Sequence, residues 1–224
     1  LAVMQQADSR ALREKFYKLY NEISPTNDNE QTKQLKSWNP FEFKAAVFFD
    51  PKKMFNLDGF DIVIGNPPYI HFEKIRKLSK NLYKPLGYKT YKARGDIYTL
   101  FYEIGVSLLK SNGHLCYITS NKWMRASYGL ALRKYFIENT SIKLLIDLGS
   151  GVFKSATVDT NILLTKNSKS TVDINAVEIM KNVEIENLAR YVKTNVVKQR
   201  YTSSDIWSIL SPIEKSIKEK IENF

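Results

Sequence analysis

Four consecutive residues, Asn66, Pro67, Pro68 and Tyr69, combine groups that could do chemistry on a planar amine. The side-chain oxygen of Asn66 and the carbonyl oxygen of Pro67 can both accept hydrogen bonds from one NH2 group, while the Tyr69 ring lies against the ring that carries it. An exocyclic amine on a purine is a poor nucleophile, because its lone pair is delocalised into the ring. Two acceptors that draw its hydrogens out of the ring plane oppose that delocalisation most strongly in the transition state, where positive charge grows on nitrogen. Such chemistry needs neither a metal nor a strong base.

The elements around these residues should hold them in place. Ile62–Ile64 is a β-branched run without a helical period, which predicts a strand covered on both faces of an α/β sheet. Gly65 lets the backbone leave the strand, and the two prolines keep the turn extended and stiff. Asn and Pro are also ordinary turn residues, but the position after a predicted strand is where α/β folds bind ligands. The context therefore favours a functional turn.

The stretch that follows is strongly basic. Between residues 74 and 94 there are eight Lys and Arg and no acid, interleaved with three tyrosines. Basic side chains with interspersed rings hold phosphates and unstacked bases, although a solvated loop would also be rich in lysine. Because the stretch adjoins the candidate turn, we favour nucleic-acid contacts. The candidates for DNA binding are Lys74, Arg76, Lys77 and Arg94.

Composition limits the class of protein. The 224 residues are 43% hydrophobic, enough for one sizeable core. The formal charge of +11 indicates an anionic partner, most commonly a nucleic acid. The single Cys116 excludes an internal disulfide framework, and His71 and His114 lack companions at metal-ligand spacing. Since there is neither an apolar run of membrane-spanning length nor a signal peptide, we expect no membrane partner and a cytoplasmic location.

The rest of the chain predicts further elements of an α/β fold. An amphipathic helix should begin at Gly95 and Asp96, with Asp96 as its N-cap, and end at 111–113. Lys122 and Trp123, just beyond the strand that follows, are candidates for a DNA-facing rim. Predicted strands span 114–119, 142–148 and 161–165, and a helix spans 130–137.

Several motifs together resemble one family. FDIVIGNPPYI at 60–70 is similar to the catalytic motif of the S-adenosylmethionine-dependent amino-methyltransferases. The longer FFDPKKMFNLDGFDIVIGNPPY at 48–69 resembles the adenine-specific DNA methyltransferase part of type IIG restriction-modification enzymes. DIYTLF at 96–101 and LLKSNGHLCYITSNKWM at 108–124 resemble its next two motifs. The resemblance implies a partial Rossmann-like methyltransferase fold, a mixed sheet with flanking helices, in a bacterial or archaeal protein.

The resemblance also implies roles for residues. The chain would transfer a methyl group from S-adenosyl-L-methionine to the N6 amine of an adenine flipped out of double-stranded DNA, with Asn66 to Tyr69 as catalytic residues. Asn66, Ile97 and Phe101 would lie on the cofactor side, although helix packing alone explains the last two equally well. GVFKSATVDTNILL at 151–164 resembles the loop whose aromatic residue packs the far face of the base, so Phe153 and Tyr69 would sandwich it. Such stacking is worth about 1–3 kcal/mol per base, comparable with the cost of unstacking one.

We expect three parts: a helix and polar linker at 1–37, a catalytic half-domain at 38–170, and a strand and helix extension at 171–224. The family binds its cofactor mainly through a glycine-rich turn after the first strand, but Gly59 is the only glycine here before the Phe60–Ile70 motif. We therefore expect the chain alone to bind S-adenosylmethionine weakly or not at all. Its partners would be a missing N-terminal cofactor-binding segment and a C-terminal target recognition domain of the parent chain.

Two alternatives remain open. Amino-methyltransferases acting on RNA adenine or on a protein glutamine share the tetrapeptide, because those substrates also present a planar NH2. They usually lack the aromatic loop represented here by Phe153 and the basic stretch. A non-catalytic DNA-binding segment with vestigial motifs is the other alternative, and the intact Asn66 and Tyr69 argue against it.

Overall fold

The computed structural model describes residues 11, 13–15, 17–18, 33, 50–52, 56–78, 81, 83–152, 158–169, 173–179 and 183–222. The chain divides into two compact units, Leu1–Gly59 and Phe60–Phe224. The predicted N-terminal helix and linker at 1–37 lie mostly outside the described residues. All elements below belong to the second unit, which contains the candidate turn.

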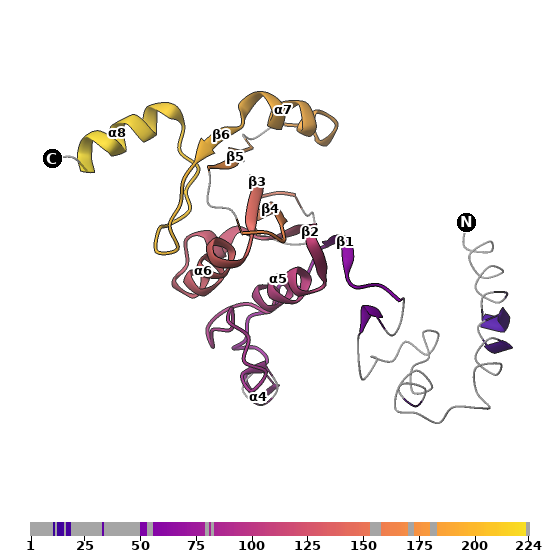
Figure 1. Cartoon of the computed structure of the whole chain (residues 1–224). Helices are drawn as coiled ribbons and strands as arrows, with labels where there is room; N and C mark the ends of the chain where they lie inside the picture. The colour runs from indigo at the N-terminus through magenta and orange to yellow at the C-terminus, as the bar shows by residue number, and fades with distance from the viewer. Residues whose placement is uncertain are drawn as a thin grey trace. The chain divides into compact units, whose positions relative to one another are not determined.

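The second unit is built on one six-stranded sheet, in which the strands run in the order β1-β2-β4-β3-β5-β6 (Figure 1). β1 and β2 are parallel, as are β3 and β5, whereas β4 is antiparallel to both of its neighbours and β6 to β5. The sheet is therefore mixed, as predicted. The strands are β1 (Phe60–Gly65), β2 (Leu109–Ser120), β3 (Ser141–Gly149), β4 (Thr160–Lys166), β5 (Ile174–Glu178) and β6 (Val197–Gln199).

Helices connect and cover the strands. They are α4 (Arg76–Leu78), α5 (Tyr98–Ser107), α6 (Leu130–Asn139), α7 (Leu188–Asn195) and α8 (Pro212–Glu222). Short 3-10 helices span Asn121–Met124, Ser127–Gly129 and Ile185–Asn187. α5 lies so close to β2 that a Cβ atom on Gly105 would fall 2.4 Å from Cδ1 of Leu115. A larger residue at this position would have to displace the side-chain ends of Leu115 and Tyr117. No helix in the described ranges combines the length and hydropathy needed to cross a membrane.

The first strand differs from the prediction. β1 was expected to be covered on both faces, but within the described residues it is an edge strand that pairs with β2 alone. Ile62 and Ile64 are 67% and 77% exposed, whereas Val63 is half-buried. A β-branched run predicts a strand, yet its position in the sheet depends on which other strands pair with it. The expected burial is therefore wrong for the described structure.

The boundary between α5 and β2 also differs. The helix ends at Ser107 rather than at 111–113, and the following residues already pair as strand. Phe60 pairs with Leu109 but Ile62 pairs with His114, so β2 carries a bulge in which Asn112 adopts a φ of 67°. Asn tolerates this left-handed conformation better than most residues. Asp96 lies one residue before the N-cap, Ile97, and does not cap the helix.

An aromatic cluster forms the core between the sheet and α5 and α6. Tyr102 and Phe136 pack edge to face with ring centroids 5.0 Å apart, and Trp123 and Trp207 pack at 5.3 Å. Trp207 is completely buried although it follows β6 in a segment without regular structure. The segment after β6 thus contributes to the same core as α5 and α6.

Candidate active site

The segments that follow β1, β2 and β3 all begin at the same side of the sheet, because the strand register places the carboxyl ends of these three strands close together. Gly65 at the end of β1 lies beside Tyr117 of β2. Ser120 at the end of β2 and Gly149 at the end of β3 both pair with Thr160 of β4. The turns after β1 and β2 and the loop after β3 therefore share the edge at which α/β folds bind ligands.

The turn after β1 holds two oxygen acceptors. Asn66 is exposed, and its Oδ1 accepts one hydrogen bond, from the hydroxyl of Tyr69 at 2.8 Å. A carbonyl oxygen has two lone pairs, so Oδ1 keeps a further acceptor position. The carbonyl oxygen of Pro67 accepts no hydrogen bond from any residue in the described part of the chain. Pro68, also exposed, has no amide hydrogen, and so the turn offers acceptors where most turns offer donors.

The hydroxyl of Tyr69 fixes this arrangement. Besides donating to Asn66, it lies 3.3 Å from the carbonyl oxygen of Ile118 on β2. Its ring packs edge to face on Tyr98, with centroids 6.2 Å apart. Burial raises the pKa of Tyr69 above its ordinary value, so the hydroxyl remains a donor at neutral pH. Tyr69 therefore both orients the Asn66 amide and presents a half-buried ring beside it.

The two residues assigned to the cofactor side lie where α5 begins. The amide of Ile97 donates to the carbonyl oxygen of Ile70 at 3.0 Å, which joins the start of α5 directly to the turn. Ile97 and Phe101 are half-buried and about one helical turn apart, so they share a side of the helix. Phe101 also packs against the core. Both side chains thus present apolar surface beside the turn, and their assignment to the cofactor side stays a prediction.

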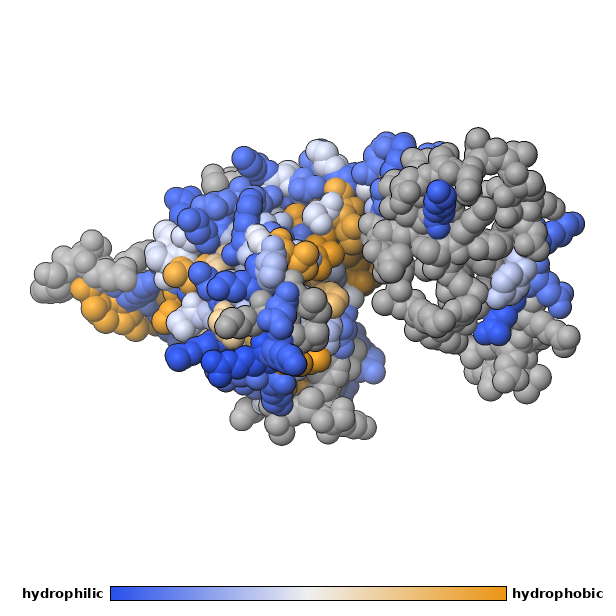
Figure 2. Space-filling view, turned by 90° about the horizontal axis from the view of Figure 1, so that it is seen from below, coloured by the Kyte–Doolittle hydropathy of each residue, from blue (hydrophilic) through white to orange (hydrophobic). Residues whose placement is uncertain are grey.

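The five basic candidates are not brought together as one set. Arg76 in α4 and Arg94 in the loop before α5 line a common pocket. Lys74 and Lys77 are exposed outside it, and Lys122 is exposed on the separate turn after β2. The face that carries α4, turned toward the viewer in Figure 2, is largely hydrophilic with hydrophobic patches between.

The turn after β2 is built differently from the expected rim. Trp123 is completely buried, and its Nε1 donates to Oδ1 of Asn161 at 3.1 Å, so its assignment to a DNA-facing surface is wrong. The guanidinium of the buried Arg133 donates to the carbonyl oxygens of Trp123 and Ala126 at 2.7 and 3.2 Å. Arg133 thereby replaces strand pairing for backbone groups that have left the sheet. Of the two expected rim residues, only Lys122 faces solvent.

A buried carboxylate links two of the three connections, and its role was not predicted from the sequence. Asp147 is 3% exposed and accepts hydrogen bonds from Nδ2 of Asn121 at 2.8 Å, a guanidinium nitrogen of Arg125 at 3.1 Å and the amide of Gly149 at 3.1 Å. A lone acid in the apolar strand IKLLIDL was the available signal, because a buried charge must be paired. Asp147 holds the turn after β2 against the end of β3.

A second buried carboxylate lies near the candidate turn after β1. Asp96 is 4% exposed, and its Oδ2 lies 3.6 Å from Nε2 of His71. Burial raises the pKa of Asp96, although the nearby His71 acts in the opposite direction. Oδ1 of Asp96 has no hydrogen-bond partner among the described residues. His71 therefore has an ionisable partner here, where the sequence offered no role for it.

The proposed stacking residue Phe153 lies outside the described residues. The loop that leads to it is described up to Val152, and Gly149 and Gly151 adopt φ values of 64° and 85°. These left-handed conformations favour glycine. The assignment of Phe153 stays a prediction.

Comparisons with known proteins agree on one class. The model of the Eco57I restriction-modification methylase family matches residues 2–153. The type II restriction enzyme and methyltransferase RM.Eco57I of Escherichia coli is 28% identical over 203 residues, covering 88% of this chain and 19% of that protein. The type II methyltransferase M.BstVI of Geobacillus stearothermophilus is 28% identical over 186 residues, covering 73% of this chain and 32% of that protein. The chain thus spans only part of the length of these relatives.

Among solved structures, a protein described as a modification subunit of a type I restriction enzyme, from Vibrio vulnificus YJ016, superposes with a TM-score of 0.52. It is 17% identical, and the match covers 70% of this chain and 37% of that one. This likeness and the mixed sheet confirm the predicted fold class.

Proposed function

The chain belongs to the Eco57I restriction-modification methylase family, and from this premise we propose that it carries the amine-activating part of a DNA adenine N6-methyltransferase. The substrate would be an adenine flipped out of double-stranded DNA, and the parent protein would belong to a restriction-modification system. Such a protein would act on DNA in the cytoplasm of a bacterium or archaeon. The net charge of +11 suits a polyanionic substrate.

The observation that carries the proposal is the pair of oxygen acceptors in the turn after β1. Asn66 Oδ1 and the Pro67 carbonyl oxygen would each accept one hydrogen of the N6 amino group, while the Tyr69 ring stacks on the purine. As positive charge grows on N6, both hydrogen bonds strengthen, which lowers the barrier more than it stabilises the bound substrate. The Tyr69 hydroxyl, donating to Asn66 at 2.8 Å, keeps the amide oxygen turned toward the amine.

S-adenosyl-L-methionine, when bound, would supply an electrophilic methyl group. In this chain, the half-buried Ile97 and Phe101 offer apolar contacts for it beside the acceptors. We propose that further contacts come from a segment placed before this region in the parent protein. Two features support this proposal: no glycine-rich turn precedes β1 in this sequence, and β1 is the edge strand of the sheet formed by the described residues, so its outer side could pair with another strand.

A substitution at Asn66 tests the catalytic assignment. Asn66→Ala in the parent enzyme should lower the rate of methyl transfer at least about a hundredfold, by analogy with single-donor deletions in oxyanion holes. Transfer of radiolabelled methyl groups to duplex DNA measures the rate. The matched control is Asn175→Ala, another exposed asparagine, on β5, which should leave turnover unchanged. Normal turnover in the Asn66 variant would remove the catalytic assignment.

A calorimetric titration tests the need for a further segment. S-adenosylmethionine added to the 224-residue chain should produce no binding isotherm at micromolar concentration, because half of the expected contacts are lacking. The parent enzyme, titrated in parallel, should bind. Micromolar binding to the shorter chain would show that its own residues suffice.

A further inference from the structure

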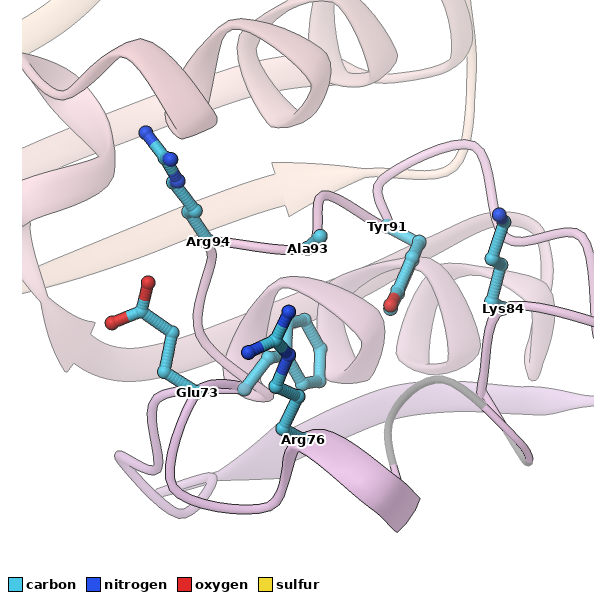
Figure 3. Close-up of a pocket in the computed structure, with 7 residues that line it drawn as sticks. Glu73, Arg76, Lys84, Tyr91, Ala93 and Arg94 are labelled. Carbon is cyan, nitrogen blue, oxygen red and sulfur yellow. The ribbon is translucent and has the colours of Figure 1, made fainter.

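A pocket of about 510 Å³ opens beside the catalytic turn, and no role in the reaction described above depends on it. Figure 3 shows its lining, which comes from three segments: the residues just after the turn, the 83–87 region, and the loop before α5. Its volume falls in the range of about 300–1,000 Å³ typical of ligand sites. The lining residues are Phe72, Glu73, Arg76, Lys84, Tyr91, Ala93 and Arg94.

The floor of the pocket is aromatic and preformed. Phe72 is 1% exposed and contacts the rings of Tyr91 and Tyr83, with centroids 5.2 and 6.0 Å away. The amide of Phe72 donates to the carbonyl oxygen of Gly95 at 3.0 Å, which fixes the floor to the loop opposite. The half-buried Tyr91 ring is therefore held against Phe72 before any ligand arrives, and it is the ring on which a base could stack.

The rim is cationic. Arg76, Lys84 and Arg94 line the pocket together with one carboxylate, Glu73, and none of these four side chains forms an ion pair with another residue in the described ranges. Figure 3 shows them arranged around the opening, with the Tyr91 hydroxyl among them. Unpaired cations around an apolar floor fit a ligand that carries both a negative charge and a planar ring. A nucleotide has both.

The pocket is tied to the catalytic turn through the backbone. Phe72 is three residues beyond Tyr69. Two backbone hydrogen bonds, from Ile97 to Ile70 and from Phe72 to Gly95, join the residues just after the turn to the loop before α5. A nucleotide held here would therefore lie near the one whose base enters the site. We propose, on the basis of the proposed function, that this pocket binds a second nucleotide of the DNA strand, next to the flipped adenine. Its phosphate contacts Arg76, while Lys84 and Arg94 add positive charge elsewhere on the pocket lining, and its base stacks on Tyr91 over Phe72.

Binding of a fluorescently labelled single-stranded oligonucleotide to the 224-residue chain, measured by anisotropy at several salt concentrations, tests this pocket. The double variant Arg76→Ala/Arg94→Ala should weaken binding about tenfold and lower the slope of log affinity against log salt by about one, because a phosphate contact is lost. Tyr91→Leu should weaken binding about fivefold or more without changing the slope, since only stacking is removed. Lys143→Ala, an exposed lysine near the start of β3, is the matched control and should change neither quantity.

Three results would overturn the assignment of this pocket. If the double variant behaves like Lys143→Ala, the pocket does not bind DNA. If Tyr91→Leu binds normally, no base stacks there. If deoxyadenosine monophosphate displaces the oligonucleotide at an equal concentration, the pocket is a site for free nucleotides and the proposal fails. Methyl transfer by the Asn66→Ala variant of the parent enzyme is measured separately from oligonucleotide binding by the pocket variants, so failure of the catalytic assignment and failure of the pocket assignment are distinguishable outcomes.

Discussion

Asn66 and Asn121 are each the first residue after one of two neighbouring parallel strands, yet their surroundings are opposite. Asn66 is exposed, and among the described residues its Oδ1 accepts a hydrogen bond from the Tyr69 hydroxyl alone. Asn121 is 4% exposed, and its amide donates to the buried Asp147. The turn after β1 is stiffened by prolines, whereas the turn after β2 is stiffened by hydrogen bonds to buried charges.

This difference shows how a turn can be rigid and still reactive. Prolines restrict the backbone without consuming polar groups, so Asn66 stays exposed, and the carbonyl oxygen of the buried Pro67 accepts no hydrogen bond from the described residues. Hydrogen bonds also restrict the backbone, but they occupy the groups that make them, as Asp147 and Arg133 do in the second turn. The turn after β1 is therefore suited to chemistry, and the turn after β2 is suited to stabilising the end of the sheet.

The largest expected effect comes from removing the buried carboxylate that holds the turn after β2. Asp147→Ala should lower the free energy of unfolding by about 3 kcal/mol, because it leaves a guanidinium, an amide side chain and a backbone amide without their acceptor. Urea denaturation measures the change. Asp61→Ala is the control: its side chain is 82% exposed in an ion pair with Lys110, and its loss should cost less than about 1 kcal/mol. Equal losses would mean that the buried network contributes no more than a surface pair.

A smaller effect compares the two asparagines directly. Asn121→Ala should lower the free energy of unfolding by about 1–2 kcal/mol, since a buried carboxylate loses one donor. Asn66→Ala should change it by less than about 0.5 kcal/mol, as expected for an exposed site. Both values come from the same denaturation experiment. A larger cost at Asn66 than at Asn121 would reverse the roles assigned to the two turns.

The smallest expected effect concerns the hydroxyl of Tyr69. Tyr69→Phe keeps the stacking ring but removes a hydrogen bond of about 1 kcal/mol, so methyl transfer by the parent enzyme should slow about fivefold. The Tyr201 hydroxyl donates to the carbonyl oxygen of Ser208 at 2.7 Å and lies away from the turn after β1. Tyr201→Phe is therefore the control and should leave the rate of methyl transfer intact. A faster Tyr69 variant would mean that the hydroxyl competes with the amine for Asn66.

Much of the second unit could be predicted from local patterns. The strands at 114–119, 142–148 and 161–165 and the helix at 130–137 all lie within observed elements, because apolar periodicity and β-branched residues act over short distances. The helix end at Ser107 was missed because the residues that follow it pair with β1 as part of β2. This pairing joins segments that are far apart in the chain. Trp123 was misplaced for a similar reason: its burial depends on Asn161 and Trp207, which lie in later segments.

The amino-acid sequence by itself determined the chemical groups of the turn, since two prolines after a strand end dictate an extended, donor-poor backbone whatever surrounds them. It also determined the basic stretch beside that turn. Only the tertiary structure decided that β1 lies at an edge, that Asp147 joins two connections, and that Arg76 and Arg94 share a pocket with Phe72. These features arise from strand order and packing, which depend on contacts between residues distant in the chain.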